Sequence, residues 1–394
     1  MSCQQITAAI VPIEKSLFDQ RPEPPPSICP RVRRGQTDVG GSDGHLFRCL
    51  KRANGCIVRA VTTMHYHPEM AIEPHALLAA LSSDQAVSGA ELARQLKVTR
   101  AAVWKQIEHL RDLGAPIEGA AGSGYRLAWP LELLDAERIR SELDGVMRER
   151  LHALAVHWQI DSTNTELQRR AANAAGVEAC LAETQTAGRG RRGRAWQSPL
   201  GGNLYFSLLR RFDAGMATLS GLSLVVGVAV VDALADCGVA KVGLKWPNDV
   251  LAEGRKLAGI LVELGGEFLG PCHAVIGIGI NLRLPAQALT RIDQPAIDVA
   301  NLHDGNVPSR NRLTARLITR LVDALDRFES HGFAAFAPAY ARSDLLRERP
   351  VRVVAAGASH EGIAAGVDER GALIVRHGKI TTHYDSAEIS VRAA

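Results

Sequence analysis

The sequence predicts an α+β protein with three successive modules. Residues 75–128 carry three short amphipathic helical patterns and then an alternating hairpin pattern, which is typical of a winged helix-turn-helix. Residues 131–346 mix strand and helix patterns without regular strand–helix–strand alternation, which favours a mixed sheet. Residues 347–394 contain only short strand patterns, enough for a small β-barrel.

The composition excludes several classes of protein. With 394 residues, 46% of them hydrophobic and 22% charged, the chain has the composition of a globular protein of two or three domains. A net charge of +4 does not by itself indicate a nucleic-acid partner. No apolar run reaches the roughly 18 residues of a membrane span. The seven cysteines form no CxxC pair, so we predict reduced thiols, a cytoplasmic protein and no metal-binding residues.

Residues 1–69 show no sustained helix or strand period and contain Pro-rich and basic stretches at 21–26 and 31–35. We predict that they are disordered or a non-native leader. Met70 opens a segment that runs directly into the first amphipathic helix, which favours translation starting there. A genuine regulatory tail is the alternative.

The winged-helix module is predicted to span residues 70–130. Thr99 is a good N-cap for its third helix, and Gly114 ends that helix. A hairpin turn is expected at residues 122–124. The apolar positions expected to face the core are Leu77, Leu78, Leu81, Leu92, Leu96, Val103, Ile107 and Leu110.

The opposite face of the third helix is a candidate DNA-binding surface, since basic side chains at such a position reach into a major groove. The alternative is that this winged helix binds protein or is purely structural. The candidate DNA-binding residues are Ser88, Thr99, Arg100, Ala101, Trp104, Lys105, Tyr125 and Arg126.

The central module is predicted to span residues 131–346. Its expected strands are 153–160, 178–184, 203–209, 243–246, 257–264 and 274–280. Its expected helices are 135–143, one starting at Thr163, 217–235, 311–329 and 333–341. In the C-terminal module a turn is expected at residues 368–371.

The most informative stretch for chemistry is GRGRRGR at residues 188–194, followed by Trp196. Arginines bind phosphate oxygens in a bidentate way, and interleaved glycines let the backbone close over an anion. The alternative is a basic stretch that is simply exposed to solvent. Because the loop lies between two apolar strands rather than in a tail, the sequence favours a polyphosphate site.

Two further segments lie at strand ends. KWPND at residues 245–249 closes one strand, and KLAGIL at 256–261 opens the next. Lys256 beside an Arg-rich loop is suited to neutralise a carboxylate that meets a phosphate, although a strand-end lysine is commonly just solvated. Asp249 is a candidate base, with a turn-forming aspartate as the alternative.

The segment DSTN at residues 161–164 precedes a helix, where it is either an N-cap cluster or the receptor of a polar ligand head. GIGIN at 277–281 is glycine-punctuated strand and is a weak signal alone. The chain has no P-loop motif, so a nucleotide would be held differently. The residues therefore predict a phosphate-binding, nucleotide-using site attached to a winged helix.

Together and in this order, GRGRRGR, KWPND, KLAGILVE and GIGIN resemble the biotin protein ligases. With the winged helix, the chain is similar to the bifunctional ligases that also repress the biotin operon. The resemblance covers residues 75–394. It implies a class II synthetase-like mixed-sheet catalytic domain and an SH3-like C-terminal barrel.

The resemblance implies that biotin's carboxylate attacks the α-phosphate of ATP, with Mg²⁺, and that a lysine of a biotin carboxyl carrier domain then takes the biotin. Biotin would also be the corepressor, operator DNA a partner, and the adenylate-bound protein a homodimer. The implied catalytic residues are Arg191, Lys256 and Asp249. The implied biotin-binding residues are Ser162, Thr163, Asn164, Gln185, Gly188, Arg189, Arg191, Lys256 and Gly259. The implied ATP-binding residues are Arg191, Arg194, Trp196, Lys245, Asn248 and Asn281.

One departure from the family pattern concerns the adenine. Repressor-type members close over it with an aromatic side chain after GIGIN, whereas the matching stretch here, residues 293–296, reads DQPA. Two alternatives remain open: a lipoate-type protein ligase, and a ligand-sensing DNA-binding repressor without ligase activity. Lys256 with Arg191 argues for phosphoryl chemistry, which a pure sensor does not need.

Overall fold

The computed structural model describes residues 51–52, 55–56, 72–120, 122–355, 358–385 and 390–393. The chain divides into two units after His67, and Pro68–Ala394 form the larger one. Before that boundary only an antiparallel pair of two-residue strands is described, β1 (Lys51–Arg52) and β2 (Gly55–Cys56). The prediction for residues 1–69 otherwise lies outside the described residues.

The first part of the larger unit is a winged helix-turn-helix, as predicted. Its elements are α1 (Pro74–Ala79), α2 (Gly89–Gln95), α3 (Arg100–Asp112), β3 (Ile117–Ala120) and β4 (Gly124–Leu127). Ser88 and Thr99 cap α2 and α3, because each hydroxyl accepts a hydrogen bond from a backbone N–H three residues on. Val103, Ile107 and Leu110 are fully buried along one side of α3, where their helical spacing places them.

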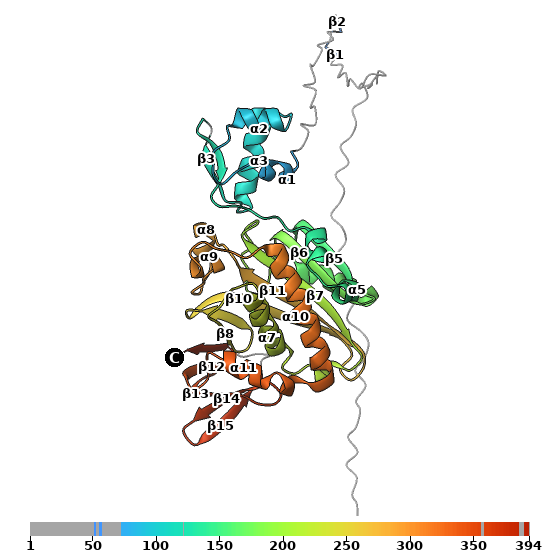
Figure 1. Cartoon of the computed structure of the whole chain (residues 1–394), viewed down its shortest axis with the longest axis vertical. Coiled ribbons are helices and arrows are strands. Elements are labelled where there is room, and N and C mark those ends of the chain that lie inside the picture. The colour runs from blue at the N-terminus through green and yellow to red at the C-terminus, as the bar shows by residue number, and fades with distance from the viewer. Residues whose placement is uncertain are drawn as a thin grey trace, which may run out of the picture. The chain divides into compact units, whose positions relative to one another are not determined.

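The central module is built on a seven-stranded mixed sheet in the order β5-β6-β7-β11-β10-β9-β8 (Figure 1). Within this sheet β5 and β6 pair in parallel, and the other neighbours are antiparallel. The strands are β5 (Leu151–Ile160), β6 (Val177–Gln185), β7 (Asn203–Phe212), β8 (Val242–Lys245), β9 (Asp249–Ala252), β10 (Arg255–Gly266) and β11 (Cys272–Asn281). The α+β class is confirmed.

Helices cover both faces of this sheet. On one face, Leu167 of α6 (Thr163–Arg170) packs in a small cluster with Cys180, Leu209 and Val275. On the other face, α7 (Leu222–Asp236) and α10 (Arg310–His331) pack against each other and over the adjacent strand positions in the main core (Figure 1). The separation follows from strand alternation, because successive side chains point to opposite faces. The face that carries α6 is the one that bears the candidate site.

Shorter elements complete this module. They are α4 (Ala136–Ser141), α5 (Gly145–Arg150), α8 (Ala286–Leu289), α9 (Val299–Leu302), α11 (Ala337–Ser343) and the 3₁₀ turns at Ala171–Asn173, Arg191–Gly193, Met216–Thr218 and Phe333–Ala335. The predicted helix at 217–235 was too long at its start, because Gly221 has φ 80° and α7 begins only after it. Strand β9 and helices α5, α8 and α9 were not predicted; each is too short to show a period.

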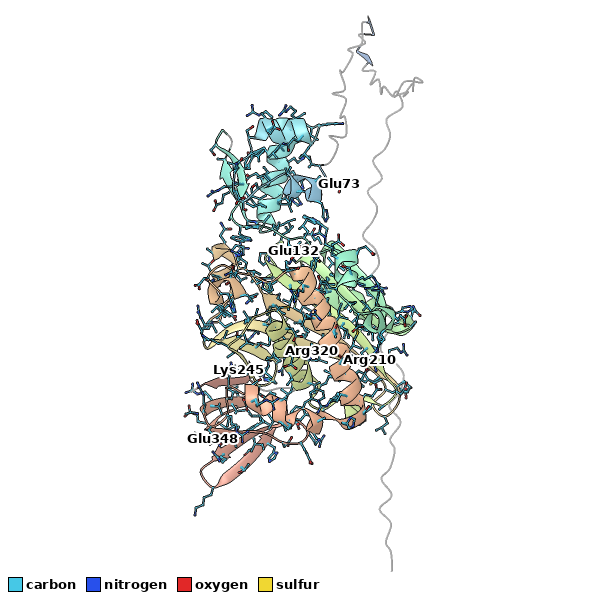
Figure 2. The ribbon with its side chains drawn as sticks, in the orientation of Figure 1. Glu73, Glu132, Arg210, Lys245, Arg320 and Glu348 are labelled. Carbon is cyan, nitrogen blue, oxygen red and sulfur yellow. The ribbon has the colours of Figure 1, made fainter. Side chains whose placement is uncertain are left out.

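A buried ion pair joins the start of α10 to the sheet. Arg310 Nη1 lies 2.7 Å from Glu183 Oε2, and both side chains are almost fully buried. The other Glu183 oxygen accepts a hydrogen bond from Leu134 N–H at 2.6 Å. Glu132, labelled in Figure 2, accepts from Ser309 Oγ at 2.8 Å and so meets the N-terminus of α10. The segment after the winged helix is thereby fixed to the sheet through charged groups.

The C-terminal module is an antiparallel five-stranded sheet in the order β15-β14-β13-β12-β16. Its strands are β12 (Pro350–Ala355), β13 (Ala358–Val367), β14 (Leu373–His377), β15 (Ile380–Tyr384) and β16 (Ser390–Ala393). The predicted turn at residues 368–371 is present, and Gly371 adopts φ 83° there. Its carbonyl accepts a hydrogen bond from the indole of buried Trp246 at 3.1 Å. Among the described residues, no helix is long and apolar enough to cross a membrane.

Candidate functional site

The floor of the site is a row of glycines on the face that carries α6. Gly259 of β10 pairs directly with Gly279 of β11, and Leu261 pairs with Gly277. Directly paired residues of antiparallel strands point to the same face. Gly259, Gly277 and Gly279 therefore leave a depression in that face where side chains would otherwise stand.

The side chains of Asn164 and Trp196 occupy this depression, and Lys256 borders it at Gly259. A Cβ on Gly277 would lie 2.3 Å from Asn164 Oδ1, and a Cβ on Gly279 would lie 2.3 Å from the Trp196 indole. A Cβ on Gly259 would lie 2.9 Å from the same indole. Glycine is needed at these positions because any side chain would clash with the groups above. In the sequence GIGIN was only a weak motif. What points to function is that its two glycines stand at alternate positions of one strand and so lie on the same face of the sheet.

The start of α6 presents a hydrogen-bonded cluster beside this floor. Ser162, Thr163 and Asn164 are buried, and the Thr163 N–H donates to Gln185 Oε1 at 2.9 Å. Ser207 of β7 lies within hydrogen-bond distance of two of them, with its Oγ 2.7 Å from Thr163 Oγ1 and 2.6 Å from Asn164 Oδ1. Sequence reasoning missed Ser207. The cluster offers hydroxyl and amide groups to a polar, uncharged ligand head.

Asp161 fixes the beginning of this cluster. Its carboxylate accepts a hydrogen bond from Arg169 Nη2 at 2.5 Å and another from Ser162 N–H at 2.7 Å. These contacts, Arg169 first, hold the pKa of Asp161 below its usual range. The carboxylate is therefore ionised at neutral pH, and it orients the turn that leads into α6.

The GRGRRGR loop forms a small hairpin over the site. Trp196 N–H donates to Gly188 O at 2.9 Å, and Gly190 N–H donates to Arg194 O at 2.7 Å. The turn is made by Arg192 and Gly193, with φ 60° and 70°. A Cβ on Gly188 would lie 2.9 Å from Trp196 O, so glycine there permits the hairpin to close. The loop is thus an ordered strap rather than a loose chain.

Charged groups gather where the strap meets β9 and β10. Lys256 Nζ lies 2.7 Å from Asp249 Oδ1 in an ion pair whose side chains are each 16% exposed. The same ammonium lies 5.6 Å from the centre of the Trp196 ring, within range of a cation–π contact. Arg191 Nη1 donates to Asn248 Oδ1 at 3.4 Å. Burial lowers the pKa of Arg191, Arg192 adds to this, and Asp249 opposes it.

Two cavities adjoin one another at these groups. A cavity of about 50 Å³ lies over the glycine floor, and one of about 680 Å³ lies beyond the strap. The residues that line both are Gly190, Arg191, Trp196, Asn248 and Lys256. The smaller cavity is far below the roughly 300 Å³ of a typical ligand site. The Trp196 indole, which covers Gly259 and Gly279, must therefore move when a ligand enters.

The larger cavity is strongly cationic. Asp249 and Asp293 are the acidic residues among those that line it. The basic residues that line it are Arg191, Arg192, Arg194, Lys245, Lys256 and Arg291. Lys245 comes from the end of β8 and is labelled in Figure 2. This excess of positive charge is suited to a polyphosphate.

The structure brings nearly all the sequence-predicted ligand residues to these cavities. The smaller one is lined by Ser162, Thr163, Asn164, Gln185, Arg189 and Gly259, and the larger one by Arg194, Lys245, Asp249 and Asn281. Gly188 lines neither of the two cavities. Asn281 uses its buried amide to donate to the carbonyls of Lys256 and Ile297, at 3.3 and 3.2 Å, so part of its hydrogen-bonding capacity is structural.

The stretch that lacks an aromatic side chain also reaches the larger cavity. Residues 291–296 line its wall, and Ala296 forms a bridge with Lys256 at the start of β10. Arg291 and Ile292 are the largest side chains of this stretch. A base bound there would therefore contact aliphatic and guanidinium surface in place of an aromatic ring.

The winged helix presents part of the predicted DNA-binding surface. Ser88, Thr99, Arg100, Ala101 and Lys105 are exposed, and Trp104 is 54% exposed. The prediction for Tyr125 was wrong: it is only 3% exposed, because strand alternation points its ring into the core of the module. Arg126 is exposed, but its guanidinium pairs with Glu118 across the hairpin at 2.8 Å.

Family models match three parts of the chain. They describe an HTH domain over residues 75–126, the biotin/lipoate A/B protein ligase family over 156–281, and the biotin protein ligase C-terminal domain over 348–392. These ranges follow the three modules described above.

Relatives and solved structures share this order. The bifunctional ligase/repressor BirA of Escherichia coli is 39% identical, covering 82% of this chain and 98% of that protein. The biotin–acetyl-CoA-carboxylase ligase of Mycobacterium tuberculosis is 33% identical, covering 65% of this chain and 98% of that protein. The structure of the biotin protein ligase from Aquifex aeolicus in complex with biotin and ATP aligns with a TM-score of 0.53 at 27% identity, covering 62% of this chain and 100% of that one.

Proposed function

This chain belongs to the biotin protein ligase family, in its bifunctional ligase and repressor form, and from that premise we propose how its residues carry out the reaction. It is a biotin–acetyl-CoA-carboxylase ligase with a DNA-binding repressor role. The alternatives of a lipoate-type ligase and of a repressor without ligase activity are not favoured.

Biotin binds over the glycine floor, with its ureido ring at the cluster formed by Ser162, Thr163, Asn164 and Gln185. ATP occupies the larger, cationic cavity. The observation that carries this assignment is that Arg191 and Lys256 line both cavities, at the place where they adjoin. A carboxylate and an α-phosphate brought to that place would repel each other, and two cations there neutralise the charge of both.

In the first step, a carboxylate oxygen of biotin attacks the α-phosphorus of ATP, and the bond to pyrophosphate breaks. Lys256 contacts the carboxylate and phosphate, Arg191 the phosphates, and Arg194, Lys245, Asn248 and Asn281 the nucleotide. Trp196 separates the reacting groups from water, since a mixed anhydride hydrolyses readily. The chain forms no covalent bond to either substrate, so its contribution is positioning and charge neutralisation.

Magnesium enters as part of the substrate, bound to the phosphates of ATP. The described residues contain no group of three acidic, histidine or cysteine side chains that would hold a resident metal. Magnesium typically uses one or two carboxylates together with substrate phosphates, and Asp249 lines the phosphate cavity. The donor set therefore fits a nucleotide-borne ion.

In the second step, the amine of an acceptor lysine attacks the acyl carbon, and AMP leaves. Asp249 faces that amine and accepts its proton, since its carboxylate lines the larger cavity and contacts Lys256, which lines both. The acceptor is a lysine of a biotin carboxyl carrier domain.

Incorporation of biotin into a purified carrier domain tests this step, with a carrier domain whose acceptor lysine is replaced by arginine as the control. Equal labelling of both carriers would contradict it.

The remaining assignments concern the organisation and location of the protein. We propose module boundaries at residues 70–130, 131–346 and 347–394. We also propose that the protein is a homodimer in the adenylate-bound state.

A cytoplasmic location agrees with the free thiols of Cys180, Cys237 and Cys272. Burial raises the pKa of Cys180 to about 12, which makes this thiol unreactive. Biotin acts as corepressor through the adenylate.

For the repressor role, we expect Arg100→Ala and Lys105→Ala to weaken binding to a duplex that the full-length protein has selected from random DNA. Both side chains are exposed on α3. Loss of a contact to a base costs about 1–3 kcal/mol of binding free energy, whereas loss of a contact to a phosphate reduces the slope of log affinity against log salt concentration by about one. Fluorescence anisotropy at several salt concentrations measures both. Arg352→Ala in β12 is the control. Unchanged affinity in both α3 variants would mean that α3 is not the DNA reader.

A further inference from the structure

We infer that Glu263 is a positioning residue that anchors the arginine strap over the bound biotin, an inference that rests on the proposed ligase function. Glu263 lies on β10 on the same face as Gly259 and Leu261, at the end of the site away from Lys256. Glu263 is the last residue of the KLAGILVE motif at residues 256–263, but the sequence alone assigned it no role.

The carboxylate of Glu263 joins two separate parts of the site. Its Oε2 accepts a hydrogen bond from Asn164 Nδ2 at 2.7 Å, and its Oε1 pairs with Arg189 Nη2 at 3.3 Å. Asn164 belongs to the buried cluster at the start of α6, and Arg189 belongs to the base of the strap, where it bridges Ala195. One side chain therefore holds the ureido-binding cluster and the strap together.

Asn164 depends on Glu263 for its orientation. Its Oδ1 is engaged by Ser207, and its Nδ2 has Glu263 Oε2 and, at a longer 3.4 Å, Leu261 O as acceptors. A buried amide with both ends satisfied keeps one orientation. Since Asn164 stands directly over Gly277, this orientation sets the shape of the biotin-binding end of the site.

The strap has side-chain contacts near both of its ends, and the two differ in what the reaction asks of them. Arg191 contacts Asn248 at the nucleotide end, but its guanidinium is needed by the phosphates of ATP. Arg189 and Glu263 lie at the other end and line no part of the larger cavity. We therefore assign to the Arg189–Glu263 pair the task of keeping the strap in place while Arg191 engages the substrate.

The test is the rate at which preformed biotinyl-adenylate leaves the full-length enzyme. The pair is partly exposed, so Glu263→Gln and Arg189→Gln should each speed release by up to about fivefold. Because both act through one contact, the double variant should release no faster than either single variant. Glu263→Ala, which also removes the Asn164 acceptor, should release about tenfold faster or more.

Two further readouts separate positioning from general destabilisation. The biotin KM of Glu263→Gln should rise more than its ATP KM, while its melting temperature stays at the wild-type value. Glu361→Gln, which breaks an exposed pair with Arg352, is the matched control and should change none of these. Wild-type release rates in Glu263→Ala, or additive effects in the double variant, would overturn the inference. A wild-type enzyme that forms no adenylate would overturn the proposed function as well.

Discussion

Lys256→Ala is expected to lower biotin-dependent adenylation by about 10²-fold or more, the loss typical of removing one preorganised charge from a transition state. Lys256 Nζ is held by Asp249 and lies against Trp196, so it is positioned before the substrates meet. The initial rate of pyrophosphate release at saturating ATP and biotin measures the effect.

The neighbouring residue supplies the control for that experiment. Arg255 lies next to Lys256 on β10, but its guanidinium pairs with exposed Glu253 outside the cavities. Arg255→Ala should stay within about twofold of the wild type, since exposed pairs contribute little. If Lys256→Ala released pyrophosphate as fast as Arg255→Ala, the assignment of Lys256 to the reaction would be wrong.

Glu183→Ala is expected to cost about 3–5 kcal/mol of stability, because it leaves the buried Arg310 guanidinium without its counter-charge. The same substitution removes the acceptor of the Leu134 N–H, so the segment after the winged helix loses its attachment to β6. Urea denaturation followed by circular dichroism measures the shift in midpoint.

Asp236→Ala is the matched comparison for Glu183→Ala. It breaks the ion pair with Arg320 of α10, which is labelled in Figure 2 and is 45% exposed. An exposed pair of this kind is worth up to about 1 kcal/mol. Equal midpoints for the two variants would show that the buried pair contributes no more than a surface pair.

Much of the fold could be predicted because its signals are local. The caps at Ser88 and Thr99 and the leucines of the first helices specify the winged helix, and long apolar alternations specify β7, β10 and β11. Elements of four to six residues, such as β9 and α8, carry too few positions for a period to appear. Gly221 shows the same limit at a boundary, since only its left-handed backbone reveals where α7 begins.

Site residues that lie in dense motifs could be predicted from the sequence. Site residues whose contacts depend on the pairing of distant strands could not. Arg191, Lys256 and Asp249 stood out as charged residues beside glycine-rich or strand-end motifs. Ser207 lies outside every motif, and Glu263 ends the KLAGILVE motif without an assigned role, because the partners of both residues come from other strands and loops. Tyr125 was misassigned for a related reason. In a strand as short as β4, the alternation of side chains does not show which residues face the core and which face solvent.

The measurement that tests the central claim most directly is pyrophosphate release from ATP by the purified protein, with biotin and lipoate compared as the acid. The polar cluster at the start of α6 matches a ureido ring and not the dithiolane of lipoate, so the account predicts release that requires biotin and is not supported by lipoate. Release with lipoate alone, or no release with either acid, would contradict the assignment of this chain as a biotin protein ligase.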